Sequence, residues 1–190
     1  MGIMGPPRIK GLSFVTLRKF VEQRFDGAEG WGRLMEKLSA EDRAVVASAA
    51  GNGWYDLALL ARTLNALDHV FGTGDFAIIR QNGIFQAEHD LKLVFRMFFR
   101  MASPSFVITK TTEYWRRHHT AGVWEIERES SQRVRGRLTD WGVDAALCAS
   151  LSAYMKRLIQ LVGGKDVILQ HPDCRVTGQP ACVFTLQWRE

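Results

Sequence analysis

The spacing at which apolar residues recur changes near residue 122, and this change restricts the possible folds more than any other feature of the sequence. Before it, apolar side chains repeat every three or four residues, as Leu57, Leu60 and Leu64 do, which is typical of one helical face. From Val123 onward the repeat is two, as in strands. Helices followed by a block of strands predict an α+β fold, with a helical layer packed on a sheet.

Glycine-containing breaks divide the helical part of the chain. The helices expected from apolar spacing and these breaks cover, approximately, residues 12–25, 31–38, 39–50, 54–71, 75–102 and 106–119. A break inside the fifth helix is expected at Asn82-Gly83. The stretch 91–101 is apolar almost all round, which is typical of a deeply buried helix or of a pocket wall.

The first two predicted strands form a hairpin with its turn at residues 130–132, and Trp124 and Ile126 are expected on its buried face. Glutamates occupy every second position of the first strand, and arginines occupy every second position of the second strand. This turn places Glu125 opposite Arg137, one of the cross-strand pairs that stabilise a sheet face by about 0.2–1 kcal/mol each.

A helix over 145–162 follows the hairpin, and two further strands are expected at 167–171 and 182–188. The predicted order is therefore helices-β-β-α-β-β, with the four strands in one antiparallel sheet. We expect a single domain over residues 1–190, since 46% of the residues are hydrophobic and no linker divides the chain. Its helical part covers 1–102 and its α+β part 103–190.

The sequence carries a formal charge of +5, which raises nucleic acid or an acidic membrane surface as partners. Glu127 faces Arg135 in the predicted hairpin, so the alternating arginines of its second strand, Arg133, Arg135 and Arg137, are neutralised within the sheet. No nucleic-acid-binding motif is present. No apolar run reaches 18 residues, and no signal peptide precedes the first helix. We expect no nucleic-acid partner, no membrane insertion and a cytoplasmic location.

Three cysteines and one histidine in the second half of the chain are the strongest chemical signal. Cys148 lies on the predicted helix, and Cys174 and Cys182 flank the loop between the last two strands. His171 precedes Cys174 by three residues, and Cys3His is an ordinary ligand set for structural zinc. Asp173 is the alternative fourth ligand. The spacing contains no CxxC pair, so three small buried hydrophobic residues are the other interpretation.

The pattern of a helical Cys148, then His171-x2-Cys174, then Cys174-x3-Gly178-x3-Cys182 resembles that of the 4-vinyl reductase domain family. Aromatic-sensing members of that family bind structural zinc through three cysteines and a glutamate, whose place His171 takes here. The overall topology resembles the wider superfamily that includes haem nitric-oxide-binding domains and a vesicle-tethering subunit. The matched stretch runs from Cys148 to Trp188, while the first hundred residues match only in helical character.

The resemblance implies a pocket between helices and sheet that holds a small hydrophobic or aromatic molecule. The side chains that we expect to line it are Phe95, Phe98, Phe99, Trp115, Trp124 and Tyr154. The predicted function is a non-catalytic, sensor-type regulatory domain with structural zinc as cofactor. A signal would leave through a homodimer built on the N-terminal helices or through a partner protein. An interaction or scaffold protein of the same fold without a ligand is the alternative.

Haem is the remaining alternative, which would make the chain a haem-based gas sensor. The histidines available as ligands are His69, His89, His118 and His119. The resemblance makes His89 the candidate axial ligand, since it lies on the helix region before Pro104, roughly where a haem-binding relative carries its proximal histidine. The Tyr-x-Ser-x-Arg propionate clamp of the haem-binding relatives is absent. The pair His118-His119 could instead hold an acidic ligand or form a solvated helix end. No sequence motif of a known catalytic site is present, and a saturated zinc site has no open position for catalysis.

Overall fold

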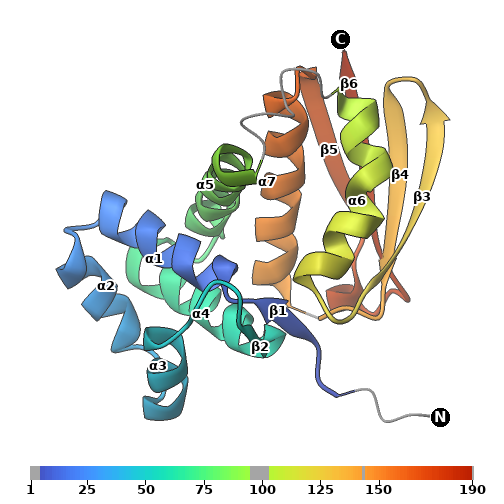
Figure 1. Ribbon diagram of the computed structural model, residues 1–190. Coiled ribbons are helices and arrows are strands. Elements are labelled where there is room, and N and C mark those ends of the chain that lie inside the picture. The colour runs from blue at the N-terminus through green and yellow to red at the C-terminus, as the bar shows by residue number, and fades with distance from the viewer. Residues whose placement is uncertain (1–4, 95–102, 143, 190) are drawn as a thin grey trace.

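The computed structural model describes residues 5–94, 103–142 and 144–189, and the chain forms a layer of N-terminal helices followed by a four-stranded sheet (Figure 1). The helices are α1 (Leu12–Arg24), α2 (Ala28–Met35), α3 (Ala40–Ala47), α4 (Leu57–Phe71), α5 (Ala77–Val94), α6 (Pro104–His118) and α7 (Ala145–Leu161). The strands are β1 (Arg8–Lys10), β2 (Trp54–Asp56), β3 (Val123–Ser130), β4 (Arg133–Thr139), β5 (Lys165–Asp173) and β6 (Cys182–Arg189). The predicted α+β class and the helices-β-β-α-β-β order of its main elements are confirmed.

Side-chain caps begin several of these helices. The Ser39 hydroxyl accepts the Asp42 N–H at 3.1 Å, as the sequence predicts for the start of α3. The prediction that a helix begins at residue 54 is wrong: residues 54–56 form β2, which pairs with β1, and the Asp56 carboxylate caps α4. This two-stranded sheet was not predicted, since three-residue strands carry almost no periodic signal.

Helix α5 runs without interruption through Asn82-Gly83, where a break was predicted. Gly83 lies against α7, because a Cβ atom at this position would be only 2.4 Å from the Ser150 carbonyl oxygen. The glycine therefore permits close contact between two helices. Helix α7, in turn, lies between the N-terminal helices and the sheet (Figure 1).

The four-stranded sheet is antiparallel, with the strand order β3-β4-β6-β5. The predicted hairpin register is confirmed: Glu125 pairs with Arg137, and Glu127 pairs with Arg135. The Glu125 carboxylate lies 2.9 Å from Nη1 of Arg137. Alternating charge thus identified the register of β3 and β4 correctly.

One face of the sheet packs against α6 and α7. Ile108 of α6 and Ile159 of α7 share a buried cluster with Trp188 of β6. Trp124 is buried as predicted, but Ile126 is 37% exposed, because β3 is the edge strand and the neighbour of Ile126 on β4 is Gly136, which has no side chain. Within the described ranges, no helix combines the length and apolar character needed to cross a bilayer.

Candidate metal centre and ligand cavity

The four predicted metal ligands come together at one end of the sheet. Cys148 lies in the first turn of α7, His171 lies in β5, Cys174 directly follows β5, and Cys182 begins β6. One ligand atom from each residue lies within 4.8 Å of the other three, so the group could hold a metal ion. Asp173, the alternative ligand, is not a member of this group.

The distances between the sulfur atoms match those of a tetrahedral zinc site. The Sγ atom of Cys148 lies 3.7 Å from that of Cys174 and 3.8 Å from that of Cys182, and the remaining Sγ–Sγ distance is 4.0 Å. A tetrahedron with Zn–S bonds of about 2.3 Å has sulfur–sulfur edges of about 3.8 Å. A disulfide would need about 2.05 Å, so the three thiols are arranged for a shared ion rather than for a bond between two of them.

The loop between β5 and β6 fixes the positions of the last two cysteines. It contains a 3-10 turn over Arg175–Thr177 and then Gly178, whose φ of +86° is the left-handed conformation that favours glycine. The Arg175 backbone N–H donates to Cys182 Sγ at 3.5 Å, and its guanidinium donates to the Trp141 carbonyl oxygen. The loop therefore holds one sulfur by a hydrogen bond suited to a thiolate.

The electrostatics of the cluster favour a bound cation. Burial raises the pKa of the Cys148 thiol, and the neighbouring Cys182 and Cys174 raise it further. Burial also raises the pKa of the Cys182 thiol. These two raised pKa values keep the thiols of Cys148 and Cys182 protonated unless a metal ion replaces their protons.

His171 has the properties of a neutral ligand. Burial lowers its pKa, and its ring stacks on Phe184 with centroids 4.2 Å apart. Its Nε2 atom is buried and has no hydrogen-bond partner within the described part of the chain. A buried nitrogen of this kind is normally satisfied, and a metal ion would satisfy it.

A cavity of about 370 Å³ lies among α5, α6, α7 and the sheet. Of the predicted lining residues, Trp115, Trp124 and Tyr154 do line it. The other three predicted lining residues fall outside the described residues and are Phe95, Phe98 and Phe99. The cavity volume lies at the lower end of the range for small-molecule sites, about 300–1,000 Å³.

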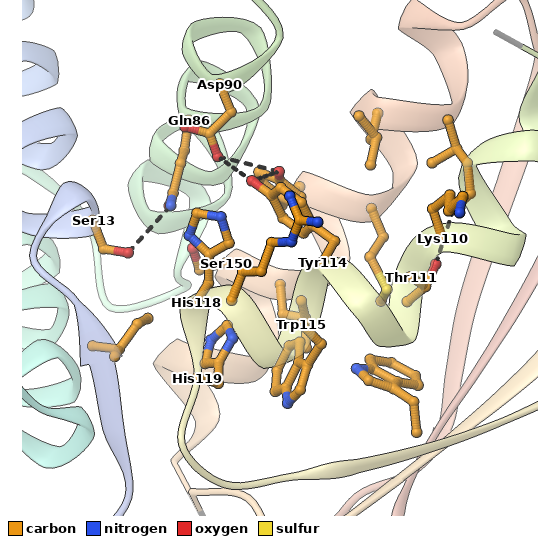
Figure 2. A pocket seen from close by; sticks show the side chains of 18 of the residues that line it. Ser13, Gln86, Asp90, Lys110, Thr111, Tyr114, Trp115, His118, His119 and Ser150 are labelled. Atoms are coloured by element: carbon orange, nitrogen blue, oxygen red, sulfur yellow. Dashed lines mark hydrogen bonds between the residues drawn. The ribbon is translucent and has the colours of Figure 1, made fainter. Parts of the chain in front are cut away.

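One end of the cavity carries a polar cluster in which Asp90 and Tyr114 (Figure 2) are joined by Tyr154. Both tyrosine hydroxyls lie 3.2 Å from Asp90 Oδ2 and 3.2 Å from each other. Burial raises the pKa of the Asp90 carboxyl to about 6, and the tyrosine hydrogen bonds oppose part of this rise. Sequence analysis missed Asp90, although its position seven residues after Gly83, on the face of α5 that includes buried Ala87, was a detectable signal.

His118 and His119 also line the cavity, at the end of α6. The His119 ring stacks on Trp115 with centroids 3.6 Å apart, and the His118 ring lies 4.3 Å from that of Tyr114. Burial lowers the pKa of His119 to about 3, and the adjacent His118 contributes to this lowering, so His119 is neutral. A neutral, stacked ring is poorly suited to holding an acidic ligand.

His89, the candidate haem ligand, lies on α5 outside the described cavity lining. Its Nε2 atom is 3.1 Å from Lys19 Nζ, and its ring lies over that of Phe85. The structure thus places His89 beside α1 rather than among the residues that line the cavity.

Comparisons with known proteins identify the fold. No family model matches the sequence, and no curated protein matches it significantly. An H-NOX protein from S. oneidensis, in its Fe(II)NO ligation state, superposes with a TM-score of 0.74 at 15% identity, over 96% of this chain and 100% of that chain. The Fe(II) unliganded H-NOX protein from K. algicida gives 0.66 at 13% identity, over 96% and 97%. The H-NOX from Shewanella woodyi gives 0.67 at 15%, over 93% of each chain. The chain therefore has an H-NOX-like fold.

Proposed function

We propose that this chain is a non-catalytic, sensor-type domain that binds a small hydrophobic or aromatic molecule and contains a structural zinc site. The observation that carries the proposal is an aromatic-lined cavity beside a Cys3His group with zinc-like geometry. The cysteine pattern supports a relationship with the 4-vinyl reductase domain family. Reduced thiols are the normal state in the cytoplasm, which is the location we propose.

Zinc would be held by Cys148, His171, Cys174 and Cys182, and it would link α7 to the adjoining ends of β5 and β6. Four protein ligands complete a tetrahedral site and leave no position for a reactive water. The ion would therefore contribute to folding rather than to chemistry, because binding to the assembled site stabilises the folded state.

Aromatic contacts connect this group to the cavity. The Trp124 ring, which lines the cavity, lies 5.7 Å from the Phe184 ring, and Phe184 stacks on His171. Loss of the metal would release His171 and loosen the packing behind Trp124. The zinc site would thus keep one wall of the cavity in place.

The H-NOX-like fold favours haem as a second candidate, because the S. oneidensis and K. algicida proteins contain Fe(II) and one solved relative comes from a study of haem distortion. The described residues of this chain do not fit it. His89 lies outside the described cavity lining. Of the two histidines in that lining, His119 stacks on Trp115, and the His118 ring lies against that of Tyr114. A Soret band in the purified protein would contradict this conclusion.

The output of the domain would pass through a homodimer built on the N-terminal helices or through a partner protein. Exposed apolar side chains in this part of the chain include Val45 of α3 and Trp54 of β2, both more than a third exposed. A scaffold protein without a ligand is the competing function, and the cavity argues against it because a scaffold has no need of unfilled space.

Metal analysis of the Cys174→Ser variant tests the zinc site. We expect one zinc per chain in wild-type protein purified without chelator, and loss of both zinc and stability in the variant. Val176→Ser is the matched control, because Val176 is exposed in the same loop and contributes no ligand atom. Wild-type protein without zinc, or a Cys174→Ser variant with full zinc content, would refute the site.

A further inference from the structure

The Asp90 carboxylate at the polar end of the cavity has one oxygen without a hydrogen-bond partner among the described residues. The residue is only 4% exposed, and its Oδ2 atom faces the hydroxyls of Tyr114 and Tyr154. Its Oδ1 atom is buried and makes no hydrogen bond with any described residue. Buried acceptors are almost always satisfied, and one that is not destabilises the protein unless a ligand or water fills the place.

Among the described residues that line the cavity, no positively charged side chain forms an ion pair with Asp90. Lys110 and Arg117 line the cavity, but both pair with Glu113, at 3.3 Å and 2.5 Å. The hydroxyls of the two tyrosines donate without bringing charge. A buried carboxylate in this position favours a cation as its next neighbour.

We infer that this end of the cavity binds the protonated amine of a small molecule whose apolar body lies against the rest of the lining, with the amine donating to the Asp90 carboxylate. The inference rests on the proposed function, because it specifies the chemical class of ligand for the same cavity. Apolar side chains suited to the body of the ligand are Ile108, Met155 and Leu186, which lie toward the sheet.

The choice of an amine follows from charge. A ligand carboxylate would be repelled by Asp90, and an alcohol would donate a hydrogen bond but leave the buried charge uncompensated. The raised pKa of Asp90 still lies below neutral pH, so the carboxylate is mostly ionised there. An ammonium group supplies both a donor and the missing charge, whereas the alcohol supplies only the donor, so the amine gains an ion-pair attraction in addition to the hydrogen bond.

Three probes that share one aromatic body test the inference by calorimetry at neutral pH: 2-phenylethylamine, 2-phenylethanol and ethylbenzene. We expect zinc-loaded wild-type protein to bind the amine at least about ten-fold more tightly than the alcohol. Asp90→Asn should remove this preference. Glu127→Gln, which removes an exposed carboxylate of β3 outside the described cavity lining, should retain it.

The outcomes separate the two proposals. If wild-type protein binds ethylbenzene or the alcohol as tightly as the amine, the inference is wrong and the hydrophobic cavity of the proposed function stands. If none of the three binds at millimolar concentration, both are overturned. The ratio of the affinities for the amine and the alcohol is measured on the wild-type protein. It therefore tests the inference even if Asp90→Asn fails to fold.

Discussion

Replacing Asp90 by asparagine should change how the stability of the protein depends on pH. Burial raises the pKa of this carboxyl from 3.8 to about 6. Between these values the folded protein holds a proton that the unfolded chain has released, so the free energy of unfolding falls as pH rises through this window. At about 1.4 kcal/mol per pH unit, the full cost of the ionised carboxylate is about 3 kcal/mol above pH 6.

Urea unfolding of wild-type protein and of Asp90→Asn, followed by circular dichroism, measures this cost. The difference between the two proteins cancels the groups they share, including the metal ligands. Burial raises the pKa of both Tyr114 and Tyr154, which therefore remain uncharged donors throughout. From pH 5 to pH 8 we expect wild-type protein to lose about 1.4 kcal/mol relative to the variant. If the free energies of unfolding of wild-type protein and Asp90→Asn changed with pH in parallel, the raised pKa assigned to the buried Asp90 carboxyl would be refuted.

Four further outcomes can be tested. Gly83→Ala should lower the free energy of unfolding by about 1–3 kcal/mol, since its Cβ would meet the α7 backbone. Gly32→Ala should raise the free energy of unfolding by about 0.5–1 kcal/mol, because Gly32 lies inside α2 and an added Cβ would meet no other atom. If both variants changed the stability measured by urea unfolding in the same direction, this packing would be contradicted. A double-mutant cycle on Glu125 and Arg137 should give a coupling of about 0.2–1 kcal/mol that falls at high salt, whereas zero coupling would contradict the pair. Light scattering should show a homodimer at micromolar concentration, and a monomer would count against that proposal.

Sequence alone predicted those parts of the fold in which residues of one type recur at regular intervals along the chain. The alternating charges of β3 and β4 gave the register because each side chain in a hairpin has a defined opposite position. The positions of the three cysteines and His171 identified the four residues that the structure brings together, because three thiols and an imidazole form an ordinary ligand set for structural zinc. Both signals are local or chemically distinctive.

The missed features depend on contacts between distant segments. Gly83 looks like a helix break in sequence, and only the position of α7 shows it to be a contact. Asp90 meets Tyr114 and Tyr154 from two other helices, so no short window of sequence contains the cluster. Ile126 has the right spacing for burial, but β3 is the edge strand and the residue opposite Ile126, Gly136, has no side chain to cover it.

The position of β6 between β4 and β5 has a consequence for partial unfolding. The neighbours β4 and β5 do not pair with each other, so β6 is the strand that joins the hairpin to the rest of the sheet. Detachment of β6 would expose the backbone edges of two strands at once, together with buried Phe184 and Trp188. Unpaired strand edges beside exposed apolar side chains promote pairing with strands of other molecules. Aggregation of this protein should therefore begin with the release of β6.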